Sequence, residues 1–546
     1  MPKHLSRSSR TNQLKRKEAG PSLTAPEIIT HVYIILMSSV FILAYNANYI
    51  DIQDFKSRLF LYLTGMYLFA EVLLLAIQFF LGERSFLITL RKRILVKNRL
   101  IFPLIFAAAV LAGWILSEWP AEAAFGIAGR QFGAVHLLLC VALYLSVTGF
   151  YRSGSIVITA FAASVAIELF VGILNLWGID PLGMYMDLIE EQHSFFIGTL
   201  GNKNVTANFL CLVLPIIMVL FIRAESRIRR SVYCVLLGMG FYYGLGVSSD
   251  SFVLGMTAAF LVLLWYCLTE EGKLEVLYQI LLLFVLSLWA MFFSVKGYPV
   301  SPFFREYPND GILGTLMNLQ MPLTVSGIFI AICLILEGIR RKGGRRILII
   351  TRNILFLLFA AAALTMLAAA VVVNLIPGEQ QEALPGLLRK LVLEDSFGSN
   401  RGYIWKKTVG AFAGLPLIKK MIGIGSDCFY LLMTPLCGEE ATTLYGAPFA
   451  DAHNEFLQFL LTCGVLGVIG YFGTMLTGCV KPRSLNSQHS LQSPAESRDI
   501  SMTLFACQTV IAAYLAQGLV NNPQTVTTPL LFLFLGICNA GSPKST

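Results

Sequence analysis

The chain of 546 residues is 56% hydrophobic and only 13% charged, with a formal net charge of +9. Soluble domains carry charges at roughly 25% of positions, so this composition excludes a soluble globular protein. The basic residues cluster beside apolar segments, which is typical of a membrane protein and argues against nucleic-acid binding.

Apolar runs of about 18 or more residues recur along the whole chain, and each can cross a hydrocarbon layer of about 30 Å as a helix. The sequence therefore predicts an all-α polytopic membrane protein, a bundle of about 14 transmembrane helices. In chain order, the predicted spans lie near residues 31–49, 59–81, 100–117, 133–150, 155–177, 205–222, 231–247, 251–268, 276–295, 321–339, 347–375, 453–480, 501–520 and 524–540.

The chain divides into two blocks of spans separated by one long loop. We predict a basic tail over residues 1–30, a transmembrane bundle over 31–375, an extracytoplasmic loop over 376–452 and a second part of the bundle over 453–546. A polar linker interrupts this second part at residues 481–500. One orientation places every basic cluster and both termini in the cytoplasm, as the positive-inside rule requires.

The long loop is expected to be ordered and partly helical. Residues 384–393 and 403–412 place apolar and basic side chains near helical period, so we predict two amphipathic helices on the membrane surface. Cys428 and Cys437 share this loop. Their spacing of nine residues does not establish a disulfide, and we favour free thiols.

Polar and ionisable residues gather where the loop re-enters the membrane, at Asp451–Gln458. An imidazole titrates near neutral pH, so His453 could accept a proton from a hydroxyl; a histidine satisfied by loop carbonyls is the equal alternative. Asp451 is interpreted as a cap of the following helix. Asn454 and Gln458 share one helix face and are candidates for binding a substrate or a neighbouring helix.

A second polar cluster lies earlier in the same loop, around Arg401 and Trp405. The guanidinium fork of Arg401 suits the oxygens of a diphosphate and could neutralise a departing one. A solvated surface arginine is the alternative, and helical period alone favours it.

Two further clusters lie in short outer loops. In the first, Asn202, Lys203 and Asn204 could bind sugar hydroxyls or phosphate, although a turn with a helix cap is the favoured alternative. In the second, Asp250 could pair with Arg401 or Lys203, bind a cation, or cap the next helix, which is the preferred interpretation.

These clusters, in this order and topology, resemble the O-antigen ligase and polymerase family, which includes the protein O-oligosaccharyltransferases. The resemblance covers roughly residues 198 to 471. The residues that carry it are Gly201–Asn204, Arg401 with Trp405, the turn Ile422–Gly425, and His453–Gln458 ahead of Gly464 and Gly467.

The resemblance implies a glycosyltransferase of the bacterial cytoplasmic membrane that acts without cofactor or metal. It would transfer a glycan from a polyprenyl-diphosphate carrier to a hydroxyl of a glycan, lipid or protein acceptor at the outer face. His453 would activate the acceptor, and Arg401 would bind the diphosphate. Family members often carry a second arginine where this chain has Asp250, which leaves open another carrier geometry, Lys203 as a substitute, or a bound cation.

Two other functions remain as alternatives, a polysaccharide flippase or transporter and a non-catalytic membrane component of a polysaccharide assembly complex. A transporter should place ionisable residues in mid-span, where Glu71 and Glu168 are the candidates. The concentration of polar groups at one membrane face favours the enzyme. Ligase and polymerase activities are both consistent with these residues.

Overall fold

The computed structural model describes residues 23–46, 48–84, 86, 94, 97–269, 273–309, 311–381, 384–389, 391–479 and 494–540. Within these ranges the regular secondary structure is helical apart from one short hairpin, in which β1 (Phe196–Ile197) pairs antiparallel with β2 (Gly201–Asn202). Eight of the described helices are long and apolar enough to cross a membrane. The chain is therefore a multi-pass helical membrane protein, as its composition predicts.

The first half of the chain supplies one set of helices of the bundle. They are α2 (Ala25–Ser38), α3 (Val40–Leu43), α4 (Ile52–Phe80), α6 (Lys97–Ile115), α7 (Pro120–Phe125), α8 (Ala134–Phe150), α9 (Ser155–Leu176), the 3-10 helix η1 (Glu190–Phe195), α10 (Lys203–Arg223), α11 (Arg227–Gly246) and α12 (Asp250–Cys267). The helix α10 is the most enclosed of the long apolar helices, with 83% of its most apolar window buried.

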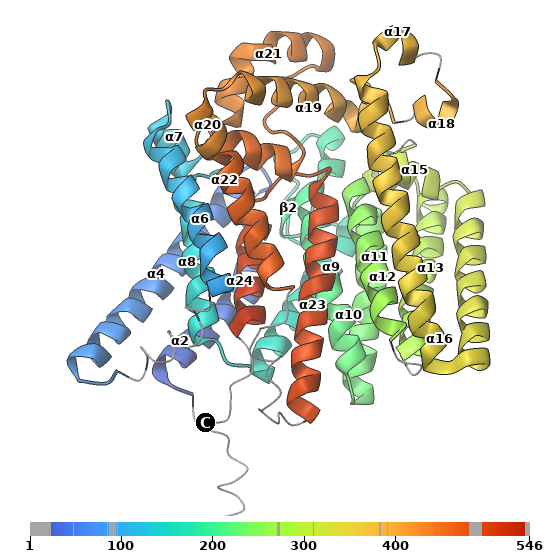
Figure 1. Ribbon diagram of the computed structural model, residues 1–546, viewed down its shortest axis with the longest axis horizontal. Helices are drawn as coiled ribbons and strands as arrows, with labels where there is room; N and C mark the ends of the chain where they lie inside the picture. The colour runs from blue at the N-terminus through green and yellow to red at the C-terminus, as the bar shows by residue number, and fades with distance from the viewer. Residues whose placement is uncertain are drawn as a thin grey trace, which may run out of the picture.

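The second half adds outer helices, the loop helices and three closing helices. They are α13 (Leu274–Gly297), α14 (Pro302–Arg305), α15 (Gly311–Leu316), α16 (Gln320–Leu375), α17 (Gly378–Gln381), α18 (Gly386–Arg389), α19 (Phe397–Gly414), α20 (Leu417–Ile422), α21 (Phe429–Tyr445), α22 (Glu455–Thr477), α23 (Pro494–Gly518) and α24 (Thr527–Ala540). In Figure 1, α19, α20 and α21 gather at one end of the bundle, which we call the loop end.

Every predicted span overlaps helical residues, although the span 31–49 falls on α2 and α3, which end at Leu43. Two of the predicted spans, 321–339 and 347–375, fall within α16, whose backbone leaves the helical conformation at Gly344 (φ 55°). There the chain reverses direction, so α16 forms two helices side by side at the edge of the bundle (Figure 1). Several other spans are short or contain polar residues, so the count of fourteen crossings stays a prediction.

The long loop is helical, but only partly as predicted. The amphipathic helix over residues 403–412 is confirmed, since it forms the middle of α19. The prediction over 384–393 is wrong, because only α18 forms there. The side chain of Asn374 binds the carbonyl of Leu391 and the N–H of Leu393, so this backbone pairs with the end of α16 instead of extending a helix. Cys428 and Cys437 are free thiols.

The helix α22 is broken where the loop crosses it. Gly464 has φ +70°, and a Cβ on it would lie 2.4 Å from the carbonyl carbon of Met421. The break leaves two backbone carbonyls of α22 without helical partners. The turn that follows α20 supplies them with donors, since Ile424 N donates to Leu461 O at 3.1 Å and Gly425 N to Thr462 O at 3.1 Å. The turn after α20 is thereby fixed against the first half of α22.

The described basic loops, after α10 and at the reversal in α16, lie at the end of the bundle opposite the loop end. The helix α10 begins at Lys203 near the loop end and finishes at Arg223, and α11 returns from Arg227. The reversal in α16 contacts the same remote end, because Arg345 Nε donates to Thr269 O, just beyond α12. This separation agrees with the single orientation that the positive-inside rule predicts.

Candidate functional site

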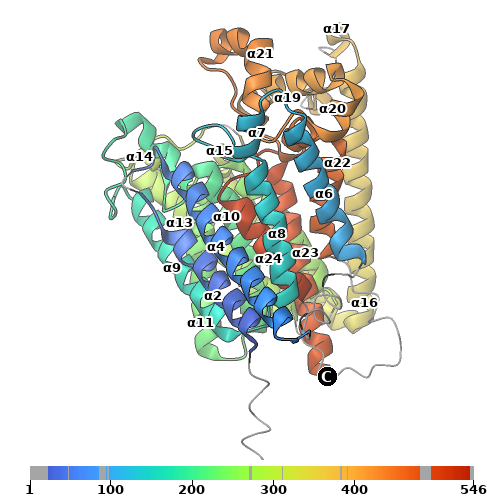
Figure 2. The same ribbon diagram turned by 90° about the vertical axis from the view of Figure 1, so that its left-hand side faces the viewer.

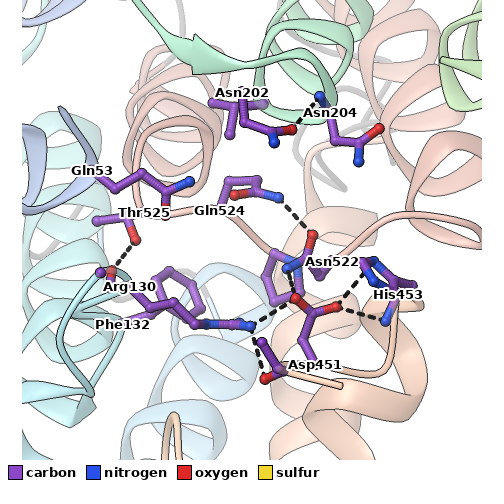
Figure 3. A pocket seen from close by; sticks show the side chains of 14 residues that line it. Gln53, Arg130, Phe132, Asn202, Asn204, Asp451, His453, Asn522, Gln524 and Thr525 are labelled. Atoms are coloured by element: carbon purple, nitrogen blue, oxygen red, sulfur yellow. Dashed lines mark hydrogen bonds and ion pairs between the residues drawn. The ribbon is translucent and has the colours of Figure 1, made fainter. Parts of the chain in front are cut away.

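A polar cavity of about 240 Å3 lies under the loop helices at the loop end. Segments distant in sequence converge on it: the start of α4, the α7–α8 link, the start of α10, the residues before α22 and the α23–α24 link (Figure 3). His453, Asn202 and Asn204 line this cavity together with Asp451. Two of the four clusters that the sequence singles out therefore meet around one space.

The imidazole of His453 is anchored by the carboxylate two residues before it. Asp451 Oδ1 lies 3.2 Å from His453 Nδ1 and accepts a hydrogen bond from His453 N at 2.8 Å. Within the described residues, Nε2 of this imidazole has no protein partner and is left for a ligand. The prediction that Asp451 caps α22 is wrong, because Asn454 is the N-cap and accepts from Leu457 N at 2.9 Å.

Arg130 joins two carboxylates beneath the histidine. Its Nε lies 3.1 Å from Asp427 Oδ1, and its Nη1 lies 2.8 Å from Asp451 Oδ2 and donates to Ala450 O at 3.1 Å. The second oxygen of Asp451 also accepts from Asn522 Nδ2 at 2.7 Å. Asp451 is therefore held by charge and by hydrogen bonds in the geometry that orients His453.

The electrostatics favour the ionised forms of Arg130 and Asp451. Burial raises the pKa of Asp451, but the contacts and hydrogen bonds that His453 and Arg130 make with it outweigh burial and hold that pKa below its usual value. Burial lowers the pKa of Arg130, but Asp427 and Asp451 together raise it above its usual value. Burial raises the pKa of Asp427, although Arg130 opposes this. Arg130 and Asp451 are thus a charged pair at neutral pH.

The rest of the cavity wall is rich in amide side chains. Gln53 comes from α4, Asn202 and Asn204 flank the start of α10, and Asn522 and Gln524 come from the α23–α24 link. Figure 3 shows Asn202 and Asn204 across the cavity from Asp451 and His453. The wall is polar, and its charged groups are the paired Arg130 and Asp451.

Arg401 lies on α19 and does not line the cavity. Its helix is docked on the histidine loop, because Trp405 Nε1 donates to Ala452 O at 2.9 Å. Arg401 Nη1 donates to Gly398 O at 2.6 Å, while its buried Nε has no partner. Burial lowers the pKa of Arg401, and the charges of Asp250 and Asp451 partly oppose this.

Lys203 and Asp250 make contacts away from the cavity. Lys203 Nζ lies 5.0 Å from the centre of the Phe195 ring, toward η1. Asp250 Oδ1 accepts from Leu313 N at 3.1 Å, so it caps α15 rather than α12, the helix that it opens. The expected pairing of Asp250 with Arg401 or Lys203 is not among the ion pairs of the described residues.

Asn454 and Gln458 hold the histidine loop in place. Asn454 Nδ2 donates to Leu519 O at 2.8 Å, and Gln458 Oε1 accepts from Ala452 N at 3.0 Å. Both side chains are buried, and neither lines the cavity. Of the two roles considered for them, the geometry supports contact with neighbouring protein segments.

Backbone strain concentrates around these residues. The non-glycine residues with positive φ in the described chain are Gln131, Ser248, Asn400, Asp427 and His453. Each is part of the network or stands within two residues of Arg130, Asp250 or Arg401. Such conformations cost about 1–3 kcal/mol each and persist where the surrounding structure imposes them, which is typical of functional sites.

The two carboxyl groups considered for a transporter each accept hydrogen bonds from protein, although Glu71 Oε2 is buried without a partner. Glu168 accepts from Thr199 N at 2.9 Å and so fixes the loop that precedes Asn202. Glu71 accepts from Thr30 Oγ1 at 2.9 Å. Among the described residues, no group of three or more His, Cys, Asp or Glu is placed to hold a metal ion.

Sequence reasoning missed Arg130, Asp427 and the pair Asn522 and Gln524. The run Asn521–Thr525 is polar between two apolar spans, and this is the signal that marks it as a candidate. Arg130 stands in a short link between spans and offers no such signal. No protein-family model matches the chain, and no curated protein matches it in sequence.

Proposed function

We propose that the chain is a membrane glycosyltransferase of the O-antigen ligase and polymerase type. It would move a glycan from a polyprenyl-diphosphate carrier to an acceptor hydroxyl at the outer face of a bacterial cytoplasmic membrane, with the loop end outside. The observation that carries the proposal is one pairing of groups. An imidazole anchored by Asp451 lines the cavity with its Nε2 unpaired among the described residues, and the helix that bears Arg401, whose buried Nε has no partner, is docked on the same loop.

The chemistry follows from the roles of the two groups. The acceptor oxygen forms a bond to the anomeric carbon, while the bond from that carbon to the diphosphate oxygen breaks. The acceptor proton passes to His453 Nε2, and the electron pair of the broken bond stays on the diphosphate. Negative charge on the leaving group grows in the transition state, so a pre-placed guanidinium at Arg401 stabilises that state more than the ground state.

The Asp451 carboxylate supports the base in two ways. Its contact with Nδ1 selects the imidazole tautomer with a free Nε2, and its charge stabilises the imidazolium that forms on proton transfer. Arg130 and Asn522 hold the carboxylate in place, so the base does not need to reorganise during the reaction.

The test is a transfer assay with purified full-length protein in liposomes that contain a polyprenyl-diphosphate-linked glycan and an acceptor. We expect His453→Gln to lower the transfer rate by about 100-fold or more, since general-base catalysis contributes about 10²–10⁴-fold. Arg401→Gln should also abolish transfer and should weaken donor binding. The matched control is Arg305→Gln, which breaks the exposed pair of Arg305 with Glu190 and should leave transfer unchanged.

Transfer near the wild-type rate in either His453→Gln or Arg401→Gln would contradict the assigned roles. The same vesicles also test whether the protein is a transporter. Movement of the donor between leaflets without glycan transfer would support a transporter and contradict the proposed glycosyltransferase. Activity of the purified protein alone would exclude a purely non-catalytic component.

A further inference from the structure

We infer that the amide-lined cavity beside His453 is a binding subsite for one uncharged sugar ring, namely the ring that carries the acceptor hydroxyl. This inference rests on the proposed function and names the substrate class of its acceptor. The argument uses the free hydrogen-bonding atoms of the wall, its charge balance and its size.

The wall offers hydrogen-bond donors and acceptors that the protein does not use. Among the described residues, neither the oxygen nor the nitrogen of the Gln53 amide has a hydrogen-bond partner. Asn202 Oδ1 accepts from Asn204 N, and Asn204 Oδ1 accepts from Ser249 Oγ. The Nδ2 atoms of Asn202 and Asn204 have no partner among these residues. Gln524 donates to Asn522 through Nε2, which leaves its Oε1 free.

Amides suit hydroxyl groups because each amide both donates and accepts. A sugar hydroxyl likewise donates one hydrogen bond and accepts others, so neighbouring hydroxyls on a ring can pair with both ends of an amide. A diphosphate has acceptor oxygens only and would leave Gln524 Oε1 unpaired. The wall therefore matches a neutral polyol better than the phosphate of the donor.

The charged groups around the cavity leave no surplus positive charge, because one guanidinium faces two carboxylates. Arg130 is paired with Asp451 on the wall and with Asp427 behind it, at 2.8 Å and 3.1 Å. No lining residue supplies a cation free of a carboxylate partner. A carboxylate-bearing sugar would enter without an opposite charge to offset the loss of its hydration, so the subsite should reject acidic sugars.

The cavity volume of about 240 Å3 lies below the range of roughly 300–1,000 Å3 that holds drug-sized ligands. This volume suits a single ring rather than a whole repeat unit. His453 forms part of the same wall, so a ring bound to the amides opposite it brings a hydroxyl toward Nε2.

The test is saturation-transfer-difference NMR on the full-length protein in nanodiscs, without donor. The probes are methyl glucoside and methyl N-acetylglucosaminide as neutral rings and methyl glucuronide as the acidic one. We expect saturation transfer to the neutral probes at millimolar concentration and a clearly weaker signal for the glucuronide. Gln53→Leu should weaken the affinity for neutral probes about three- to tenfold, the effect of one lost neutral hydrogen bond.

The matched control is Gln320→Leu, which alters an exposed amide outside the cavity and should leave binding unchanged. Gln524→Leu provides a second cavity variant, and gel filtration of each variant verifies folding. The inference is overturned by absent saturation transfer to the neutral probes, by an equal or stronger glucuronide signal, or by wild-type affinity in both cavity variants. Because the readout needs no donor, its failure leaves the transfer result for His453 and Arg401 standing.

Discussion

Arg130 is the residue on which the charge balance of the site depends. It separates two carboxylates that are both buried, Asp427 and Asp451, and contacts each of them directly. Two unneutralised carboxylates in such a place would repel each other and lack hydration. The arginine therefore has a structural effect that extends to His453 through Asp451.

We predict that Arg130→Met destabilises the protein by about 3–5 kcal/mol, because removing one partner leaves buried charges without compensation. Thermal unfolding of the purified protein in detergent measures the change. The control is Arg305→Met, which removes the exposed ion pair with Glu190. Because solvent screens this pair, its loss should change the free energy of unfolding very little. Equal stabilities of the two variants would contradict the role of Arg130.

At this scale the sequence identifies His453 and Arg401 as candidates but not their surroundings. Asp451 and His453 are two residues apart, so their contact follows from local geometry once the loop is fixed. Arg130 and Asp451 are 321 positions apart, and no pattern in the chain links them.

Among the elements, α22 determines where the histidine lies. Its break at Gly464 lets the turn after α20 cross the helix backbone, and the same turn leads to Asp427. The loop helix α19 adds a second constraint through Trp405 and Ala452. The candidate site is thus assembled by docking of loop helices on a discontinuous helix.

We predict that Gly464→Ala destabilises the protein by at least about 1–3 kcal/mol, the cost of a side chain at positive φ. The clash with the Met421 backbone adds to this cost. The control is Gly327→Ala in α16, where a Cβ meets nothing within 4 Å and a change of less than about 1 kcal/mol is expected. Thermal unfolding of both variants makes the comparison, and similar midpoints would show that the break is not required.

The helical period of the loop residues predicts α19 but not α21, and it overextends α18. The helical period shows which face of a segment is apolar. The length of these helices depends in addition on side chains such as Asn374, which hydrogen-bond to backbone groups that would otherwise continue the helix. The spans are predicted better, because in hydrocarbon the backbone has no alternative to internal hydrogen bonds.

At the scale of the whole molecule, the loop helices and the short basic loops lie at opposite ends of the bundle. The loop helices and the cavity occupy one end, and the basic loops around Arg223, Arg227 and Arg345 occupy the other, while Figure 2 shows the same separation from the side. From the positive-inside rule we expect the loop end to face the outside.

We predict that Thr443→Cys in α21 reacts with a membrane-impermeant maleimide on intact cells, whereas Lys342→Cys near the reversal of α16 reacts only after the cells are opened. Both side chains are exposed, so accessibility depends on the side of the membrane. Cells with the unmodified chain give the background from native thiols. Labelling of Lys342→Cys from outside would reverse the proposed orientation.

The sequence by itself determined the membrane class, the position of the spans and the polar loops between them, because burial in hydrocarbon imposes a local requirement on every segment. Only the tertiary structure decided which polar residues share a cavity. Arg130, Gln53, Asn522 and Gln524 join His453 through contacts between segments far apart in the chain, and such contacts are fixed by packing rather than by any local pattern.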